Sequence, residues 1–292
     1  MIHKAGFVSI VGNPNVGKST LSNLLVGERL SIITEKAQTT RHKIFGIVNE
    51  KDYQIIFSDT PGVLEPAYKL QESMLKFSKS ALTDADIILF ITDTVEKAGK
   101  NEQFIKEVST LNIPILLVIN KIDISNQEEL EKLIDIWKQL LPTAEIFPVS
   151  ALRKFNTDNL NKRIIELIPP SPPYFDKEAL TDKPERFFVS EIIREKILLY
   201  YQKEIPYSTE VEVEEFKESS EIVNIRAVIH VARDSQKGII IGFQGKALKK
   251  LGIEARRDIE TFLAKKVYLQ LFVKVSKDWR NQERFLKNFG YE

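Results

Sequence analysis

The sequence predicts an α/β domain with a doubly wound, mainly parallel sheet, followed by a smaller α+β domain. In residues 1–168, short apolar runs alternate with helical patterns, which is typical of a parallel sheet covered by helices. A proline-rich stretch then interrupts both patterns, and helices and strands follow a different order beyond it. Because 292 residues suit two domains, we expect one at 1–168, a linker at 169–185 and a second domain at 186–292.

The elements of the first domain follow from the apolar runs and their periodicity. We expect strands at 7–11, 44–48, 53–57, 87–91, 115–119 and 146–149. Helices are expected at 18–25, 69–82, 101–111, from about 126 to 141, and 157–168. Ser125 and Glu128 fit the S-x-x-E capping box, which would open the fourth of these helices.

Five of the twelve prolines lie between Pro169 and Pro184. Since proline runs continue neither a helix nor a central strand, this stretch reads as a semi-rigid linker. In the second domain we expect strands at 210–216, 222–232 and 267–275, and helices at 191–203, 246–251, 253–265 and 282–288. The two middle helices would be separated by a break at Gly252.

Composition excludes several classes of protein. The chain has no cysteine, so disulfides, thiolate catalysis and a cysteine-type zinc site are excluded. Its formal net charge is +1, so any nucleic-acid signal must be local. The N-terminus does not resemble a signal peptide, and no apolar run approaches the roughly 20 residues that span a bilayer. We expect a cytoplasmic protein.

Residues 12–19 read GNPNVGKS, which fits the phosphate-binding motif G-x-x-x-x-G-K-[ST] between a strand and a helix. The two glycines let backbone N–H groups face a phosphate, and the helix N-terminus adds partial positive charge. Lys18 is expected on the β- and γ-phosphates and Ser19 on Mg²⁺. The motif predicts a nucleoside triphosphate site.

Two further segments complete the part of the predicted site that binds the metal and the γ-phosphate. Residues 59–62 read DTPG after an apolar strand, so Asp59 can hold a Mg²⁺ water and the Gly62 N–H can meet the γ-phosphate. Residues 38–41 read QTTR, and a threonine there can close over Mg²⁺ when the γ-phosphate is present. We expect Thr40 rather than Thr39 as the ligand, and Lys18, Thr40, Asp59 and Gly62 as the catalytic set.

Residues 120–123 read NKID, and they predict selection of guanine. The Asp123 carboxylate can accept hydrogen bonds from both N1–H and N2–H₂ of guanine, which adenine does not offer. Lys121 would lie over the base, Asn120 would tie the loop to its neighbours, and the Ala151 N–H could bond guanine O6. The nucleotide-binding set is Gly12, Asn13, Asn15, Val16, Gly17, Lys18, Ser19, Thr20, Asn120, Lys121, Asp123, Ser150, Ala151 and Leu152.

These motifs, in this order, resemble those of the translation-factor-related GTPases over the whole first domain. Many GTPases carry a glutamine after D-x-x-G to orient water, whereas this chain has Val63. Intrinsic hydrolysis should therefore be slow. In some similar GTPases with a P-loop asparagine and a T-T-R switch, that asparagine helps to coordinate K⁺. Asn15 and the loop before Thr39 match this pattern, so K⁺-stimulated hydrolysis is our hypothesis.

A second loop predicts nucleic-acid binding in the C-terminal half. Residues 239–246 read IIIGFQGK, the I-I-G-x-x-G form of a type II KH domain, whose glycines let a nucleic-acid backbone approach. From Lys237 to Lys274 nine basic residues stand against three acidic ones, whereas 204–221 holds seven acidic residues and one lysine. The expected RNA-binding residues are Ile241, Gly242, Phe243, Gln244, Gly245, Lys246, Lys249, Lys250, Arg256 and Arg257. KH loops usually carry a basic residue between the glycines, which this one lacks.

One GTPase domain, a proline-rich segment and a KH domain, with IEARR at 253–257, resemble the Era family of bacterial GTPases over essentially the whole chain. The resemblance implies binding to the 3′ end of small-subunit (16S) rRNA during 30S subunit assembly, as a monomer, with GTP, GDP and Mg²⁺ as ligands and no DNA partner. It also implies peripheral association with the inner face of the cell membrane. The alternatives are a KH-like domain that docks onto protein, and a membrane-linked signalling GTPase.

Overall fold

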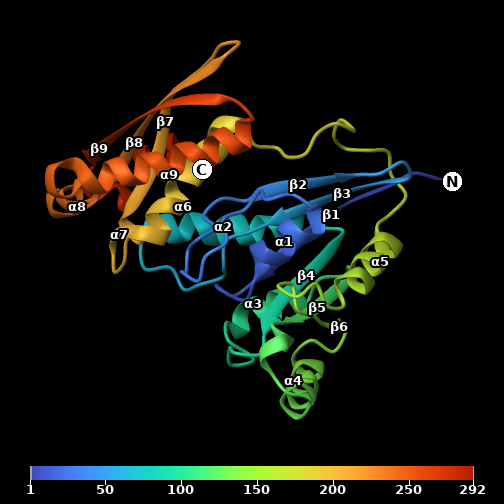
Figure 1. Cartoon of the computed structure of the whole chain (residues 1–292). Coiled ribbons are helices and arrows are strands. Elements are labelled where there is room, and N and C mark those ends of the chain that lie inside the picture. Colours follow the sequence, from blue (N-terminus) through green and yellow to red (C-terminus); the bar gives the residue numbers. More distant parts are fainter. Residues whose placement is uncertain (1, 292) are drawn as a thin grey trace. The chain divides into compact units, whose positions relative to one another are not determined.

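The computed structural model describes residues 2–291 and divides into two compact units (Figure 1). The first unit ends at Asp182 and the second begins at Lys183, while the short stretch Ala67–Ser73 groups with the second. None of the helices in this described range combines the length and the apolarity that a membrane crossing needs.

The first unit is built on a six-stranded sheet in the order β2-β3-β1-β4-β5-β6. Every neighbouring pair is parallel except β2 and β3, which confirms the doubly wound, mainly parallel prediction. Its strands are β1 (Lys4–Gly12), β2 (Ile44–Asn49), β3 (Tyr53–Asp59), β4 (Ile87–Asp93), β5 (Ile115–Asn120) and β6 (Glu145–Pro148).

Helices cover both faces of this sheet. One core joins the sheet to Leu21 of α1 (Lys18–Val26) and Leu160 of α5 (Thr157–Leu167). A second core, on the other face, contains side chains of α2 (Lys69–Thr83), α3 (Glu102–Ser109) and α4 (Gln127–Leu140). Because both faces are buried, the central strands are apolar throughout, and β4 and β5 are buried at every position.

The carboxyl ends of the parallel strands meet at one edge of the sheet. The strand registers pair Ile10 with Asp59, Gly12 with Ile91, and Asp93 with Asn120. In open α/β sheets this edge, where the strand order reverses, is where ligands bind. The fold therefore brings together motifs that lie far apart in the sequence.

The segment predicted to be a semi-rigid linker packs on the first unit. Gln54 is fully buried, and its side-chain oxygen accepts from the N–H groups of Tyr174 (2.7 Å) and Phe175 (3.0 Å). The Ile47 N–H of edge strand β2 donates to the Leu180 carbonyl (2.8 Å). The segment thus covers a sheet edge whose backbone groups would otherwise lack partners. The linker boundaries 169–185 are corrected: the division falls at Asp182, and Glu185 already begins a helix.

The second unit is an α+β domain with a three-stranded sheet, β7-β8-β9. Strands β7 and β8 are antiparallel, and β8 and β9 are parallel. Helices α6, α8 and α9 bury their apolar faces against the sheet. The elements are α6 (Glu185–Tyr200), α7 (Ile205–Ser208), β7 (Thr209–Glu218), β8 (Ile222–Val231), α8 (Asp234–Ile241), α9 (Lys246–Leu263), β9 (Lys266–Val275) and α10 (Glu283–Asn288).

Two local predictions are wrong. Helix α9 continues through Gly252 without a break, because the burial of Leu251, Ala255 and Ile259 on one face outweighs the roughly 1 kcal/mol that an interior glycine costs. The expected capping box does not form, since Asn126, rather than Ser125, accepts the hydrogen bond from the Glu129 N–H that caps α4.

Candidate nucleotide site and KH groove

The phosphate loop joins β1 to α1 and depends on two glycines in left-handed or related conformations. Gly12 has φ 145° and Gly17 has φ 94°. A Cβ atom on Gly12 would lie 2.1 Å from the Ile91 carbonyl oxygen, and one on Gly17 would lie 2.2 Å from Asn120 Nδ2. Since real Cβ atoms do not approach so closely, only glycine fits either position.

The Lys18 ammonium group is buried and donates to the Asn13 carbonyl at 2.8 Å. Burial lowers the pKa of Lys18 to about 8, and the nearby carboxylates of Asp59 and Glu96 oppose that shift. Negative phosphate oxygens at this loop would raise the pKa again. The lysine is therefore placed to gain a charged partner when a nucleotide binds.

Three expected Mg²⁺ ligands gather beside the loop. The hydroxyl oxygens of Ser19 and Thr40 lie 2.8 Å apart. Asp59 is fully buried, and neither carboxylate oxygen has a hydrogen-bond partner in the described chain. Burial raises the pKa of Asp59, while the nearby Ser31 hydroxyl and Lys18 lower it. A buried carboxylate beside two hydroxyls suits a hard cation with oxygen ligands, so these residues fit Mg²⁺.

The two adjacent threonines of the switch segment have different surroundings. The Thr39 hydroxyl bonds the Thr34 hydroxyl and the Lys36 carbonyl, both at 2.6 Å. The Thr40 hydroxyl lies 2.8 Å from the Ser19 hydroxyl. These distances are compatible with Thr40 as the Mg²⁺ ligand, which stays a prediction.

The D-x-x-G segment lies directly over the phosphate loop. The Val63 N–H donates to the Gly12 carbonyl at 3.0 Å. A Cβ atom on Gly62 would come within 2.7 Å of Pro14 backbone atoms, so only glycine allows this approach. Val63 is 4% exposed, and its side chain lies in the core between the sheet and the helices of one face. Its side chain is therefore part of the core and offers no hydrogen-bonding group.

The guanine end is held by Asn120, which connects three segments. Its Nδ2 donates to the Val16 carbonyl (2.9 Å), and its Oδ1 accepts from the Ala151 N–H (3.0 Å). The Ala151 N–H, expected to bond guanine O6, is thus already used within the protein and would be shared or exchanged on binding. The Ser150 hydroxyl donates to Asp123 Oδ1 at 2.6 Å, which orients that carboxylate, while Leu152 beside them is exposed.

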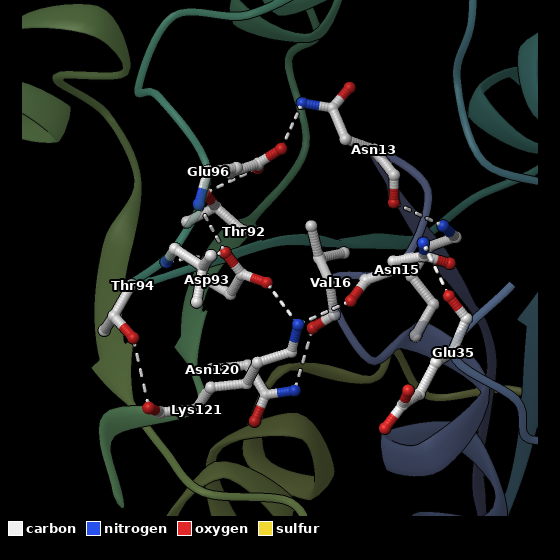
Figure 2. Close-up of polar contacts among 12 residues, drawn as sticks. Asn13, Asn15, Val16, Glu35, Thr92, Asp93, Thr94, Glu96, Asn120 and Lys121 are labelled. Carbon is white, nitrogen blue, oxygen red and sulfur yellow. Dashed lines mark hydrogen bonds and ion pairs between the residues drawn. The ribbon is translucent and has the colours of Figure 1, made fainter. Parts of the chain in front are cut away.

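Lys121 crosses between the phosphate loop and β4 (Figure 2). Its ammonium group donates to the Asn15 carbonyl and pairs with Asp93 Oδ2, both at 2.6 Å. The Asn15 side chain in turn donates to the Glu35 carbonyl at 3.0 Å, which links the P-loop to the residues that precede the switch segment 38–41. Of the other expected residues, Val16 is buried in the core and Thr20 is half-buried in the first turn of α1.

Sequence reasoning missed a polar network at the end of β4. The Asn13 amide donates to Glu96 (2.8 Å), and Thr92 donates to the other oxygen of that carboxylate (2.8 Å). Asn101 reaches both Asn13 and the Val63 carbonyl. The one feature of the sequence that could have indicated this network is the position of Thr92. It lies near the end of a buried parallel strand, at the same sheet edge as the P-loop.

In the second unit, the G-x-x-G loop joins α8 to α9. Gly242 and Gly245 have φ of 70° and 76°, and Gln244 between them has φ 50°. Phe243 is 76% exposed, and Lys246 Nζ lies 5.5 Å from its ring centroid. The loop therefore presents backbone, one aromatic ring and one cation to solvent.

Beside this loop lies a groove of about 420 Å³ between α9 and β9. Its lining residues are Gly245, Leu248, Lys249, Gly252, Ile253, Arg256, Leu269 and Leu271. An apolar floor with two cations at the rim suits unstacked bases and a phosphate backbone. Among the other expected contacts, Lys250 lies over the Tyr200 ring instead (5.3 Å), while Ile241 and Arg257 are not part of the lining.

Comparison with known proteins agrees with a GTPase domain followed by a KH domain. Residues 7–121 match the family model described as 50S ribosome-binding GTPase, and residues 204–280 match the KH domain model. The chain is 45% identical over 295 residues to GTPase Era of Alkaliphilus metalliredigens (strain QYMF), across the full length of both proteins. The chain belongs to the Era family.

Solved Era structures share the fold over nearly the whole chain. One is Era in complex with MgGDPNP and nucleotides 1506–1542 of 16S ribosomal RNA, and another is a variant of Aquifex aeolicus Era bound to GDP and AlF₄⁻. Each has a TM-score of 0.94 and 41% identity, and each comparison covers 99% of both chains. The Era family fold is therefore a P-loop GTPase domain followed by a KH domain.

Proposed function

We propose that this Era-family GTPase is a GTP-controlled factor that binds the 3′ end of small-subunit rRNA and acts in 30S subunit assembly. The observation that carries the proposal is a G-x-x-G groove with cations at its rim in the same chain as a GTP site. The support from relatives is the solved Era complex, which holds both MgGDPNP and nucleotides 1506–1542 of 16S rRNA. The intact loop favours RNA over a protein as the ligand of the groove.

At the nucleotide site each residue has a proposed task. Asp123 accepts from the guanine base, the P-loop N–H groups and Lys18 bind the phosphates, and the Gly62 N–H meets the γ-phosphate. Ser19, Thr40 and the buried Asp59 would hold Mg²⁺ directly or through water. When bound, the metal neutralises charge that develops between the β- and γ-phosphates. Loss of the γ-phosphate would release Thr40 and the switch segment.

Slow hydrolysis stimulated by K⁺ is part of the same proposal. The buried Val63 offers no group to orient water, and the Asn15 side chain donates to the Glu35 carbonyl just before the switch segment. A K⁺ ion coordinated by oxygens of this loop would add positive charge near the β–γ bridge. We expect turnover to be faster in KCl than in NaCl, and Asn15→Ala to remove the difference. Equal rates in the two salts would contradict the K⁺ role.

RNA binding is tested by fluorescence polarisation with an RNA copy of the organism's own small-subunit rRNA 3′ end. The protein is loaded with a non-hydrolysable GTP analogue or with GDP, and a shuffled RNA of equal length is the control. We expect tighter binding of the native RNA, most of all with the GTP analogue. Arg256→Ala should weaken it, whereas Lys217→Ala, a change at an exposed strand residue outside the groove, should not. Equal affinity for native and shuffled RNA would overturn the rRNA proposal.

We also propose a cytoplasmic location, where that RNA is found, with peripheral association at the inner face of the membrane and a monomeric state. Cell fractionation and sedimentation of the purified protein test these points. Recovery of the protein only as an integral membrane component, or as a stable oligomer, would contradict them.

A further inference from the structure

The polar network under the phosphate loop suggests a role for Asn101 in the reaction. This residue occupies the N-cap position of α3 in a left-handed conformation, with φ 62°. Asparagine at a helix N-cap usually accepts a hydrogen bond from the first turn, which contributes roughly 0.5–2 kcal/mol. Asn101 makes no such bond. Its side chain is directed to the nucleotide site instead.

The Asn101 amide donates both of its hydrogens across two motifs. Nδ2 bonds Asn13 Oδ1 of the phosphate loop at 2.5 Å and the Val63 carbonyl at 3.1 Å. Val63 follows Gly62 directly, and its own N–H bonds the Gly12 carbonyl. Both backbone groups of Val63 are therefore held, the N–H by the phosphate loop and the carbonyl by Asn101.

The orientation of these amides is set by Glu96. A carboxylate only accepts hydrogen bonds, so the group that Asn13 turns toward Glu96 must be its NH₂ (Figure 2). The Asn13 oxygen then faces Asn101, which must present its NH₂ in turn. Thr92 and the backbone N–H of Glu96, which donates to Asp93 at 2.8 Å, hold the glutamate in place. One carboxylate thus orients a chain of donors that ends on the Val63 carbonyl.

We propose that Asn101 is a positioning residue for GTP hydrolysis, which acts through Val63 to hold the Gly62 N–H toward the γ-phosphate, with Glu96 and Asn13 fixing its orientation. The proposal rests on the proposed function, since it refines the γ-phosphate end of that site. GDP has no γ-phosphate, so its binding should not depend on Asn101. The expected signature is a fall in the hydrolysis rate at saturating GTP with unchanged GDP affinity.

The test compares Asn101→Asp with Asn101→Gly. Aspartate keeps the size and tolerates the left-handed conformation but cannot donate, whereas glycine keeps the conformation and removes the side chain. The matched control is Asn156→Asp. Asn156 is also a left-handed N-cap, that of α5, and its amide also donates to a carbonyl, that of Pro148 at 2.9 Å. It therefore reports the effect of losing such a bond away from the γ-phosphate.

We expect both Asn101 variants to lower the single-turnover rate by about tenfold, the size expected for one or two lost hydrogen bonds. Asn156→Asp should hydrolyse at the wild-type rate, and all variants should bind GDP like the wild type. A wild-type rate in the Asn101 variants, or a parallel loss of GDP affinity, would overturn the proposal. If the wild type itself does not hydrolyse GTP, the proposed function fails instead.

A second measurement tests the chain of orientation. Glu96→Ala frees the Asn13 amide to turn, so it should slow hydrolysis in the same way as Asn101→Asp. Combining the two changes should add little, because residues in one network are not additive. Fully multiplicative effects would show that Glu96 does not act through Asn101.

Discussion

If Asp123 selects guanine as proposed, we expect Asp123→Asn, which exchanges one carboxylate oxygen for an amide nitrogen, to reverse that preference. The carboxylate lies in a short 3-10 turn after β5, where the Ser150 hydroxyl donates to Oδ1 at 2.6 Å. In Asp123→Asn, the amide oxygen can still accept this bond, so the loop should keep its shape. The amide NH₂, however, would face the N2–H₂ donors of guanine.

The expected loss of guanine-nucleotide affinity follows from the hydrogen bonds that change. The wild-type carboxylate would accept two charge-assisted hydrogen bonds from guanine, each contributing about 1.5–3 kcal/mol. In Asp123→Asn the amide oxygen can still accept from guanine N1–H, but the bond to N2–H₂ is lost and two donors face each other. Losing that bond should weaken GTP and GDP binding by about 1.5–3 kcal/mol, which is roughly a 10–10²-fold rise in Kd. Xanthine carries a carbonyl in place of the guanine amino group, so the amide introduced by Asp123→Asn can donate to that carbonyl and accept from N1–H.

The assay is equilibrium displacement of a fluorescent nucleotide by GDP and by xanthosine diphosphate. We expect Asp123→Asn to prefer the xanthine nucleotide, whereas the wild type prefers guanine. Asp158→Asn, the same change on the exposed first turn of α5, is the matched control and should leave the preference unchanged. The reasoning is refuted if Asp123→Asn keeps wild-type affinity for GDP, or if it binds neither nucleotide while its folded state melts normally.

Three further outcomes are expected. Gly62→Ala places a Cβ atom 2.7 Å from Pro14 and should abolish single-turnover hydrolysis while GDP still binds. Gln54→Ala removes three hydrogen bonds to the segment covering β2 and should destabilise the first unit by about 1–4 kcal/mol. Thermal unfolding should show this as a lower Tm for the transition that added GDP shifts upward. Gln270→Ala, at an exposed residue, is the control. Gly242→Ala, at φ 70° and with a Cβ 2.6 Å from an α9 side chain, should weaken RNA binding without changing GDP affinity.

The sequence predicts the strand alternation and the motif positions of the first unit because the apolar runs and the phosphate-binding glycines are local signals. Asp59 and Asn120 could be placed at one edge of the sheet because each ends a buried strand. Lys18 could be placed at the same edge because its loop follows a third buried strand. The network of Glu96 and Asn101 could not be predicted, because it depends on how one loop folds back under another.

Other features escaped prediction for the opposite reason, since local signals pointed the wrong way. Prolines at 169–173 suggest a linker, but the buried amide of Gln54 binds the segment that follows them to the sheet. Ser125 with Glu128 fits a capping box by spacing, yet Asn126 one residue later caps the helix instead. In both cases a tertiary contact or a neighbouring residue outcompetes the pattern.

Gly252 has a consequence for any attempt to make this protein more robust. A glycine-to-alanine change inside an exposed helix face normally stabilises a protein by about 1 kcal/mol. The Cβ atom would meet Leu271 at 3.4 Å, an ordinary contact, so the folded state would accept it. Yet Gly252 and Leu271 both line the groove, and the added methyl group would make it shallower. Selection for heat resistance would favour alanine at this position, whereas selection for ligand binding would retain glycine. The residue found at position 252 therefore indicates which of the two properties was selected.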